Sequence, residues 1–289
     1  MKLRPVPRAP TWRASLFKFP PVMSARACQK ACGVCAIIPL SRLFSLEYTA
    51  LFDLINPGLC ALGLPIALGG TSNHFRVSAL AAVGGWDEWN VAEDADLGIR
   101  LARYGYRIGS LDSDTSEEAP HEFRNWFRQR VRWQKGWLQT IIVHSRHPVR
   151  FCRDFGALRA CAATTLIVGT VAGALLWPPF ALDTFWRAFG PGAALLPRSR
   201  EAVDLFVYLL ACAGIWAVLG PAIVAARQRR LNVGVWSFAL LPLYYVLVTL
   251  AAWTAIADLI VRPHFWAKTE HGRARRKPIP ASALRRSQV

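Results

Sequence analysis

The chain has 289 residues, 53% of them hydrophobic, and its 35 Lys and Arg residues outnumber 18 Asp and Glu residues to give a formal net charge of +17. This length allows one large domain or two small ones. The basic residues cluster beside long apolar runs and in the C-terminal tail rather than along one groove. This pattern excludes a nucleic-acid-binding role and indicates a membrane protein.

Residues 1–40 are predicted to be an irregular basic segment. No Asp or Glu precedes Glu47, and prolines interrupt any helical or strand period. No apolar core followed by a cleavage site is present, so we expect no secretory signal peptide. Cys28, Cys32 and Cys35 have the C-x3-C-x2-C spacing that can hold an iron–sulfur cluster. No alternation of strands and helices follows, which favours free thiols instead.

The polar region, residues 41–155, begins with a predicted helix over 42–55, which is either a core helix or one lying on the membrane surface. After it, Gly69 and Gly70 would let a ligand approach the backbone closely. Thr71 and Asn73 supply hydrogen-bonding groups directly afterwards. The alternative is a strand end and turn that simply favour these residues.

Three acids begin the next predicted helix, "EDADLGIRLARYG". Asp94 stands three residues before Leu97 and so shares the inward face of this helix, whereas Glu93 and Asp96 point elsewhere. Carboxylates in a first turn also cap a helix and complement its dipole, which is the structural alternative to a catalytic role.

The segment "HEFRNWFRQRVRWQKGWLQTIIVH" is predicted to form a long helix. Gln129, Arg132 and Trp133 stand at i, i+3 and i+4 and share one face, which Trp126 and Trp137 would extend. A guanidinium binds phosphate oxygens, and an indole offers a flat surface to a sugar ring. The competing interpretation is an aromatic and basic helix that seats the domain on lipid headgroups.

Residues 156–262 are predicted to hold three transmembrane segments, at about 160–182, 205–226 and 233–261. Basic clusters precede the first segment, follow the second and fill the tail, residues 263–289. All of them favour the cytoplasm. Three crossings would leave the tail outside, so the third segment is expected to be a bent or re-entrant hairpin around Pro242.

The motifs "AEDADLGIRL" and "RQRVRW" resemble the TED and QxxRW motifs of membrane-bound bacterial family 2 glycosyltransferases, the group that contains cellulose, hyaluronan and poly-N-acetylglucosamine synthases. "LGGTSNHFR", "GGWD" and "FWAKTEHG" are also similar, so the resemblance covers about 42–272. It implies an α/β partial GT-A domain followed by transmembrane helices. The implied activity is inverting transfer of a sugar from a nucleotide-sugar donor, such as a UDP-sugar, to a glycan or lipid acceptor at the cytoplasmic face of the inner membrane.

The same resemblance implies the roles of single residues. Asp94 matches the general base, which removes a proton from the acceptor hydroxyl. The matches to the groups that bind donor and acceptor are Gln129, Arg132 and Trp133, with Thr71, Asn73 and Glu93 beside them. Ala92 departs from the pattern, because it stands where the motif usually has Thr.

The resemblance also implies Mg2+ or Mn2+, held in this family by a D-x-D pair that precedes the base motif. No acid precedes Glu47, and the D-S-D triplet at residues 112–114 follows the base motif. We therefore expect an N-terminally truncated glycosyltransferase that is inactive alone, with an inauthentic first segment and a partner chain that supplies the donor half. The alternative is a non-catalytic membrane subunit or remnant that pairs with a separate catalytic half.

Overall fold

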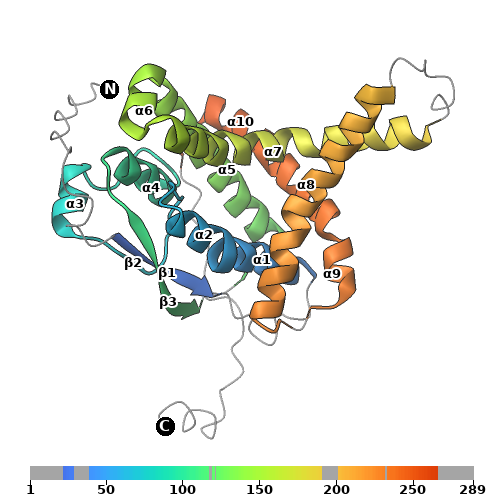
Figure 1. Ribbon diagram of the computed structural model, residues 1–289, viewed down its shortest axis with the longest axis horizontal. Helices are drawn as coiled ribbons and strands as arrows, with labels where there is room; N and C mark the ends of the chain where they lie inside the picture. Colours follow the sequence, from blue (N-terminus) through green and yellow to red (C-terminus); the bar gives the residue numbers. More distant parts are fainter. Residues whose placement is uncertain are drawn as a thin grey trace, which may run out of the picture.

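The computed structural model describes residues 22–28, 39–116, 119–120, 122–190, 201–231 and 233–265. A compact group of short helices and strands lies beside a set of long helices (Figure 1). In chain order the elements are β1 (Val22–Cys28), α1 (Pro39–Thr49), the π-helix η2 (Ala50–Ile55), α2 (Asn56–Ala61), β2 (Asn73–His74), α3 (Val77–Ala82), α4 (Glu93–Arg103), β3 (Ile108–Ser116), α5 (Phe123–Ser145), α6 (Pro148–Phe155), α7 (Ala157–Phe189), α8 (Glu201–Gln228), α9 (Val235–Ala239) and α10 (Leu241–Val261).

A three-stranded sheet in the order β2-β1-β3 gives the polar region its α/β character. Strand β1 pairs parallel to β3 and antiparallel to β2. The prediction that residues 1–40 are wholly irregular is therefore wrong for 22–28, which form the central strand. This strand is stabilised by pairing with β3, which lies some 80 residues away. A contact so distant in the chain leaves no periodic pattern of apolar residues by which the strand could be predicted. Cys32 and Cys35 lie outside the described residues.

The D-S-D triplet falls at an irregularity in the pairing of β1 with β3. Leu111 pairs with Ala25, and the next partner of β1 is Asp114, opposite Arg26. Residues 112 and 113 are thus extra residues on β3. Such a bulge bends a strand and interrupts its ladder of hydrogen bonds.

Helix α4 lies over the extended segment that leads from α2 to β2. Leu97 and Leu101 are fully buried against Ile66 and Leu68. A Cβ atom at Gly98 would lie only 2.4 Å from the carbonyl oxygen of Ile66, so glycine is needed for this close contact. The apolar face predicted for this helix is confirmed, and it fixes where the first turn of α4 lies.

Three helices of the described chain, α7, α8 and α10, are long and apolar enough to cross a membrane, judged by length and composition. Their positions, length and apolar composition agree with the three long apolar segments predicted from the sequence. The bend predicted near Pro242 is found at Leu240, between α9 and α10. Pro242 lies in the first turn of α10, where a missing N–H leaves no hydrogen bond unmade. Because α10 then runs without a break from Leu241 to Val261, a re-entrant hairpin around Pro242 is not formed.

Helix α10 packs along α5, the helix that carries the Q-x-x-R-W residues. Near its start, the Tyr244 hydroxyl donates to Glu47 Oε2 at 2.6 Å and accepts from Arg130 Nη2 at 2.6 Å. Near its end, Asp258 Oδ2 accepts a hydrogen bond from Lys135 Nζ at 2.8 Å. Both ends of α10 are thus fastened to the α/β region.

Candidate active site

Asp94 lies in the first turn of α4, beside the loop that carries Gly69 and Gly70. Its Oδ1 accepts a hydrogen bond from the Ala95 N–H at 2.8 Å. A Cβ atom at Gly70 would stand 3.0 Å from Asp94 Oδ2, so the glycine backbone approaches this carboxylate closely. The structure thus places the glycine loop beside the acidic first turn of α4, a contact that the sequence pattern did not predict.

The environment of Asp94 prepares it to accept a proton. The pKa of its carboxyl is raised to about 6, mainly by burial and to a smaller extent by the nearby Glu93 carboxylate. The Ala95 N–H and the Arg132 guanidinium act in the opposite direction. A carboxylate with a pKa close to the working pH is well suited to general base catalysis.

Arg132 of α5 faces the same acids. Burial lowers the pKa of its guanidinium, while the Asp94 and Glu93 carboxylates act against that change. Its Nη1 donates to the Val91 carbonyl at 3.3 Å. Within the described residues, Arg132 Nε and Gln129 Oε1 are buried and have no hydrogen-bond partner. Unpaired buried polar atoms are costly, and a bound ligand would supply the partners that these two atoms lack.

A close contact between α5 and the residue before α4 sets the distance between Arg132 and Asp94. A Cβ atom at Gly136 would stand 2.3 Å from Ala92 Cβ, so only glycine allows this approach. Gln139 Oε1 accepts from the Val91 N–H at 3.0 Å, and Asn90 Nδ2 donates to Thr140 Oγ1 at 2.9 Å. Sequence reasoning missed these contacts, because the glycine and amides of α5 show no pattern of their own.

Asp96 joins the two helices and does not face the site. It is 1% exposed, and its carboxylate contacts Arg100 Nε at 2.6 Å and His144 Nε2 at 3.0 Å. Because Arg103 Nη1 can only donate, His144 Nδ1 accepts from it at 2.9 Å, and His144 Nε2–H donates to Asp96. Although burial opposes it, the His144 hydrogen bond and the Arg100 charge lower the pKa of Asp96. Asp96 therefore positions α4 against α5.

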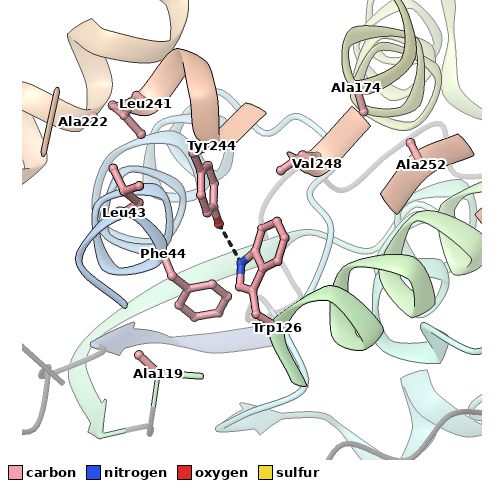
Figure 2. Packing of buried hydrophobic residues seen from close by; sticks show 10 residues of the cluster. All are labelled: Leu43, Phe44, Ala119, Trp126, Ala174, Ala222, Leu241, Tyr244, Val248 and Ala252. Atoms are coloured by element: carbon pink, nitrogen blue, oxygen red, sulfur yellow. Dashed lines mark hydrogen bonds between the residues drawn. The ribbon is translucent and has the colours of Figure 1, made fainter. Parts of the chain in front are cut away.

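The aromatic face predicted on α5 is wrong in part. Trp126 is fully buried and donates through Nε1 to the Tyr244 hydroxyl at 3.2 Å (Figure 2). Trp137 packs against the cluster between α4, α6 and α7. Trp133 is half-buried and stacks on Tyr48 with ring centroids 5.9 Å apart. Helical spacing places these indoles on one face, but packing against α1, α7 and α10 covers two of them.

Some of the polar residues that follow Gly69 and Gly70 make hydrogen bonds that stabilise the loop itself. Asn73 Nδ2 donates to the Gly69 carbonyl, and Ser72 hydrogen-bonds to Thr115 of β3. Ser72 has a φ of 53°, which makes this a tight turn. Thr71 and Glu93 are half-buried beside Gly70 and Asp94 in the chain. Of the predicted set, the structure brings together Asp94, Glu93 and Arg132.

The described residues do not fit a divalent cation. Among them, no three His, Cys, Asp or Glu side chains are grouped so as to hold a metal ion. The charged group that faces Asp94 and Glu93 is the guanidinium of Arg132, which would repel a cation. The side chains of Asp112 and Asp114 lie outside the described part of the chain.

Comparison with curated proteins finds short regions of similarity. The chain is 40% identical over 74 residues to the probable glycosyltransferase YdaM of Bacillus subtilis, covering 25% of this chain and 18% of that protein. It is 34% identical over 80 residues to the beta-monoglucosyldiacylglycerol synthase of Synechocystis, covering 27% and 17%. It is 35% identical over 68 residues to the probable glucomannan 4-beta-mannosyltransferase 1 of Arabidopsis thaliana, covering 23% and 12%.

The matched region thus spans less than a fifth of the length of each of these relatives. A family model covers much more of this chain. The model described as Glycosyl transferase family group 2 matches residues 59–257, which include α4, α5 and most of the three long helices. The chain therefore belongs to the family 2 glycosyltransferases.

Proposed function

We propose that this protein, paired with a chain that supplies the donor-binding half, transfers a sugar from a nucleotide-sugar donor, such as a UDP-sugar, to a glycan or lipid acceptor with inversion at the anomeric carbon. Residues 41–155 would be the acceptor-side half of a GT-A domain. The observation that carries the proposal is the half-buried Asp94, whose pKa is raised to about 6, beside Arg132 and the Gly70 backbone.

In the proposed reaction, Asp94 removes the proton from the acceptor hydroxyl, and the resulting oxygen attacks the anomeric carbon. The bond from that carbon to the donor diphosphate breaks as the new glycosidic bond forms, which inverts the configuration. Arg132 stabilises the negative charge that develops on the departing diphosphate. Gln129, whose Oε1 is buried without a partner among the described residues, accepts a hydrogen bond from donor or acceptor.

The relatives support both acceptor classes. One is named a glucomannan mannosyltransferase and another a beta-monoglucosyldiacylglycerol synthase, so one name refers to a glycan and the other to a lipid. Mg2+ or Mn2+ would accompany the donor in the proposed reaction. Its ligands would come from outside the described residues or from a partner chain.

Replacing Arg132 tests the proposal directly. In native membranes supplied with Mn2+, which would retain a partner chain, we expect Arg132→Ala to lower sugar transfer from a radiolabelled UDP-sugar about a hundredfold or more. Arg124→Ala is the matched control, because Arg124 is an exposed arginine two turns earlier on α5 and should leave transfer unchanged. Equal activity of both variants would contradict the assigned role of Arg132. Absence of donor binding and transfer in the unaltered protein would favour the non-catalytic membrane subunit.

We further propose that α7 and α8 cross the inner membrane and that α10 lies at the cytoplasmic surface of this membrane, beside the catalytic region, without crossing it. The contacts of α10 with Glu47 and Lys135 lie near its two ends. Two crossings leave all three basic clusters in the cytoplasm, which resolves the conflict that three crossings create. With exposed Cys152 of α6 as the sole cysteine, a membrane-impermeant maleimide should label inside-out vesicles and not intact cells. Labelling of intact cells would contradict this topology.

A further inference from the structure

A cavity of about 270 Å³ lies between α5 and the end of α10. One wall comes from α5 and includes Arg128, Val131 and Arg132. The opposite wall comes from α10 and the residues after it, including Thr254 and Arg262. The cavity therefore connects the helix that carries Arg132 with a helix long and apolar enough to enter a membrane.

The cavity has an excess of positive charge. Its lining includes the basic side chains of Arg128, Arg132, Lys135 and Arg262 but only one carboxylate, that of Asp258. Lys135 Nζ is satisfied by Asp258 Oδ2 at 2.8 Å and by the carbonyl oxygens of Arg262 and Phe265 at 2.5 and 3.0 Å. Asp258 is thus already paired, and it cannot neutralise the remaining arginines.

The arginines retain donors for an anion. Within the described residues, Arg128 makes no hydrogen bond or ion pair, and Arg132 Nε has no partner. The Arg262 guanidinium uses Nε and Nη2 on Asp258 Oδ1, at 3.1 and 2.7 Å. Its Nη1 makes no hydrogen bond to the described residues. Several guanidinium groups that line one cavity can bind a phosphate, because its oxygens accept paired hydrogen bonds from them.

The rest of the cavity is apolar and continues along α10. Phe127, Val131 and Phe265 contribute to its lining. Leu250 and Val261 lie one turn before and two turns after Thr254 on the same helical face, and they are 52% and 74% exposed. A ligand with an acyl or isoprenoid chain could therefore bury that chain along this face while its phosphate lies among the arginines.

We propose that this cavity binds the phosphate head of an anionic membrane lipid, with the lipid chain lying along α10. Lipid binding at this cavity needs neither a sugar donor nor an acceptor. Arg132 lines both the cavity and the candidate active site, so a bound lipid phosphate would lie directly beside the catalytic groups.

Native mass spectrometry of the full chain in detergent tests this proposal with dioleoyl phosphatidic acid as the probe. We expect saturable binding of phosphatidic acid, but not of dioleoyl phosphatidylcholine or diacylglycerol. Arg128→Gln and Arg262→Gln should each weaken binding about tenfold, as expected for the loss of a hydrogen bond to a charged group. Arg124→Gln removes an exposed α5 arginine outside the cavity and should leave binding unchanged.

Other outcomes would overturn the proposal. Equal binding of all three lipids would show that the phosphate is not recognised. If Arg124→Gln weakened binding of phosphatidic acid as much as the cavity variants do, the lipid would be held by the general positive charge of the surface. Inorganic phosphate or UDP that binds to the cavity arginines and displaces phosphatidic acid would assign the cavity to a soluble phosphate. Because Arg262 also pairs with Asp258, melting curves accompany each variant, and Thr254→Phe, which fills the cavity from α10, should block lipid binding with Arg262 in place.

Discussion

Replacement of Asp94 by Asn is expected to abolish most sugar transfer while making the protein more stable at neutral pH. Loss of a general base lowers a rate by roughly 10² to 10⁴. The folded protein holds the ionised Asp94 at a cost, because burial raises its pKa from 3.8 to about 6. At about 1.4 kcal/mol per pKa unit, removal of this charge should stabilise the fold by about 3 kcal/mol above pH 7.

The pH dependence follows from the same shift. Folding favours protonated Asp94, so its destabilising effect is fully present above the folded pKa of about 6 and disappears as the pH falls toward 3.8. The difference in unfolding free energy between the Asn variant and the unaltered protein should therefore shrink between pH 6 and pH 4. Transfer by the unaltered protein should be constant above pH 7 and fall to about a tenth of its plateau at pH 5.

Thermal melting and transfer assays over this pH range measure both effects. Asp87→Asn is the matched control, because Asp87 lies in the loop before α4 and its Oδ1 only accepts the Trp89 N–H at 3.1 Å. That variant should change neither the rate nor the pH profile. Retained transfer in Asp94→Asn would show that Asp94 is not the base. An unchanged melting temperature would show that burial of the ionised Asp94 carboxylate does not destabilise the folded protein.

Glu47→Gln is expected to destabilise the protein by about 3 to 5 kcal/mol, because it leaves the charge of Arg130 buried without a counter-ion. Arg130 is 4% exposed, and its Nη1 contacts Glu47 Oε1 at 2.7 Å. Although burial opposes it, the Glu47 carboxylate raises the pKa of the Arg130 guanidinium. Four aromatic rings, including those of Phe44 and Trp133, also surround this guanidinium.

This loss should appear as a lower melting temperature in detergent. Glu88→Gln removes an exposed carboxylate and serves as the control, with no expected change. In the Glu47→Gln background, Arg130→Gln should cost much less than in the unaltered protein, because the unpaired charge is then removed. Additive losses in this double-mutant cycle would mean that the two side chains do not stabilise each other.

Much of the local structure could be predicted from the sequence. The apolar spacing of Leu97 and Leu101 predicted α4, and the apolar length of 205–226 predicted α8. These signals are local, since a helix presents one face at a period of 3.6 residues and a membrane segment needs about 20 apolar residues. Strand β1 had no such signal, because its partner β3 lies far along the chain.

The sequence by itself determined the family, the helix that carries Asp94 and the helix that carries Arg132, because short motifs in a fixed order can be recognised without a three-dimensional structure. Only the tertiary structure decided which of those side chains meet. The contact of Gly136 with Ala92 brings Arg132 to Asp94, while the packing of α10 buries Trp126 among apolar side chains. Helical spacing places a residue on a face, but which face is buried depends on elements that pack there from far along the chain.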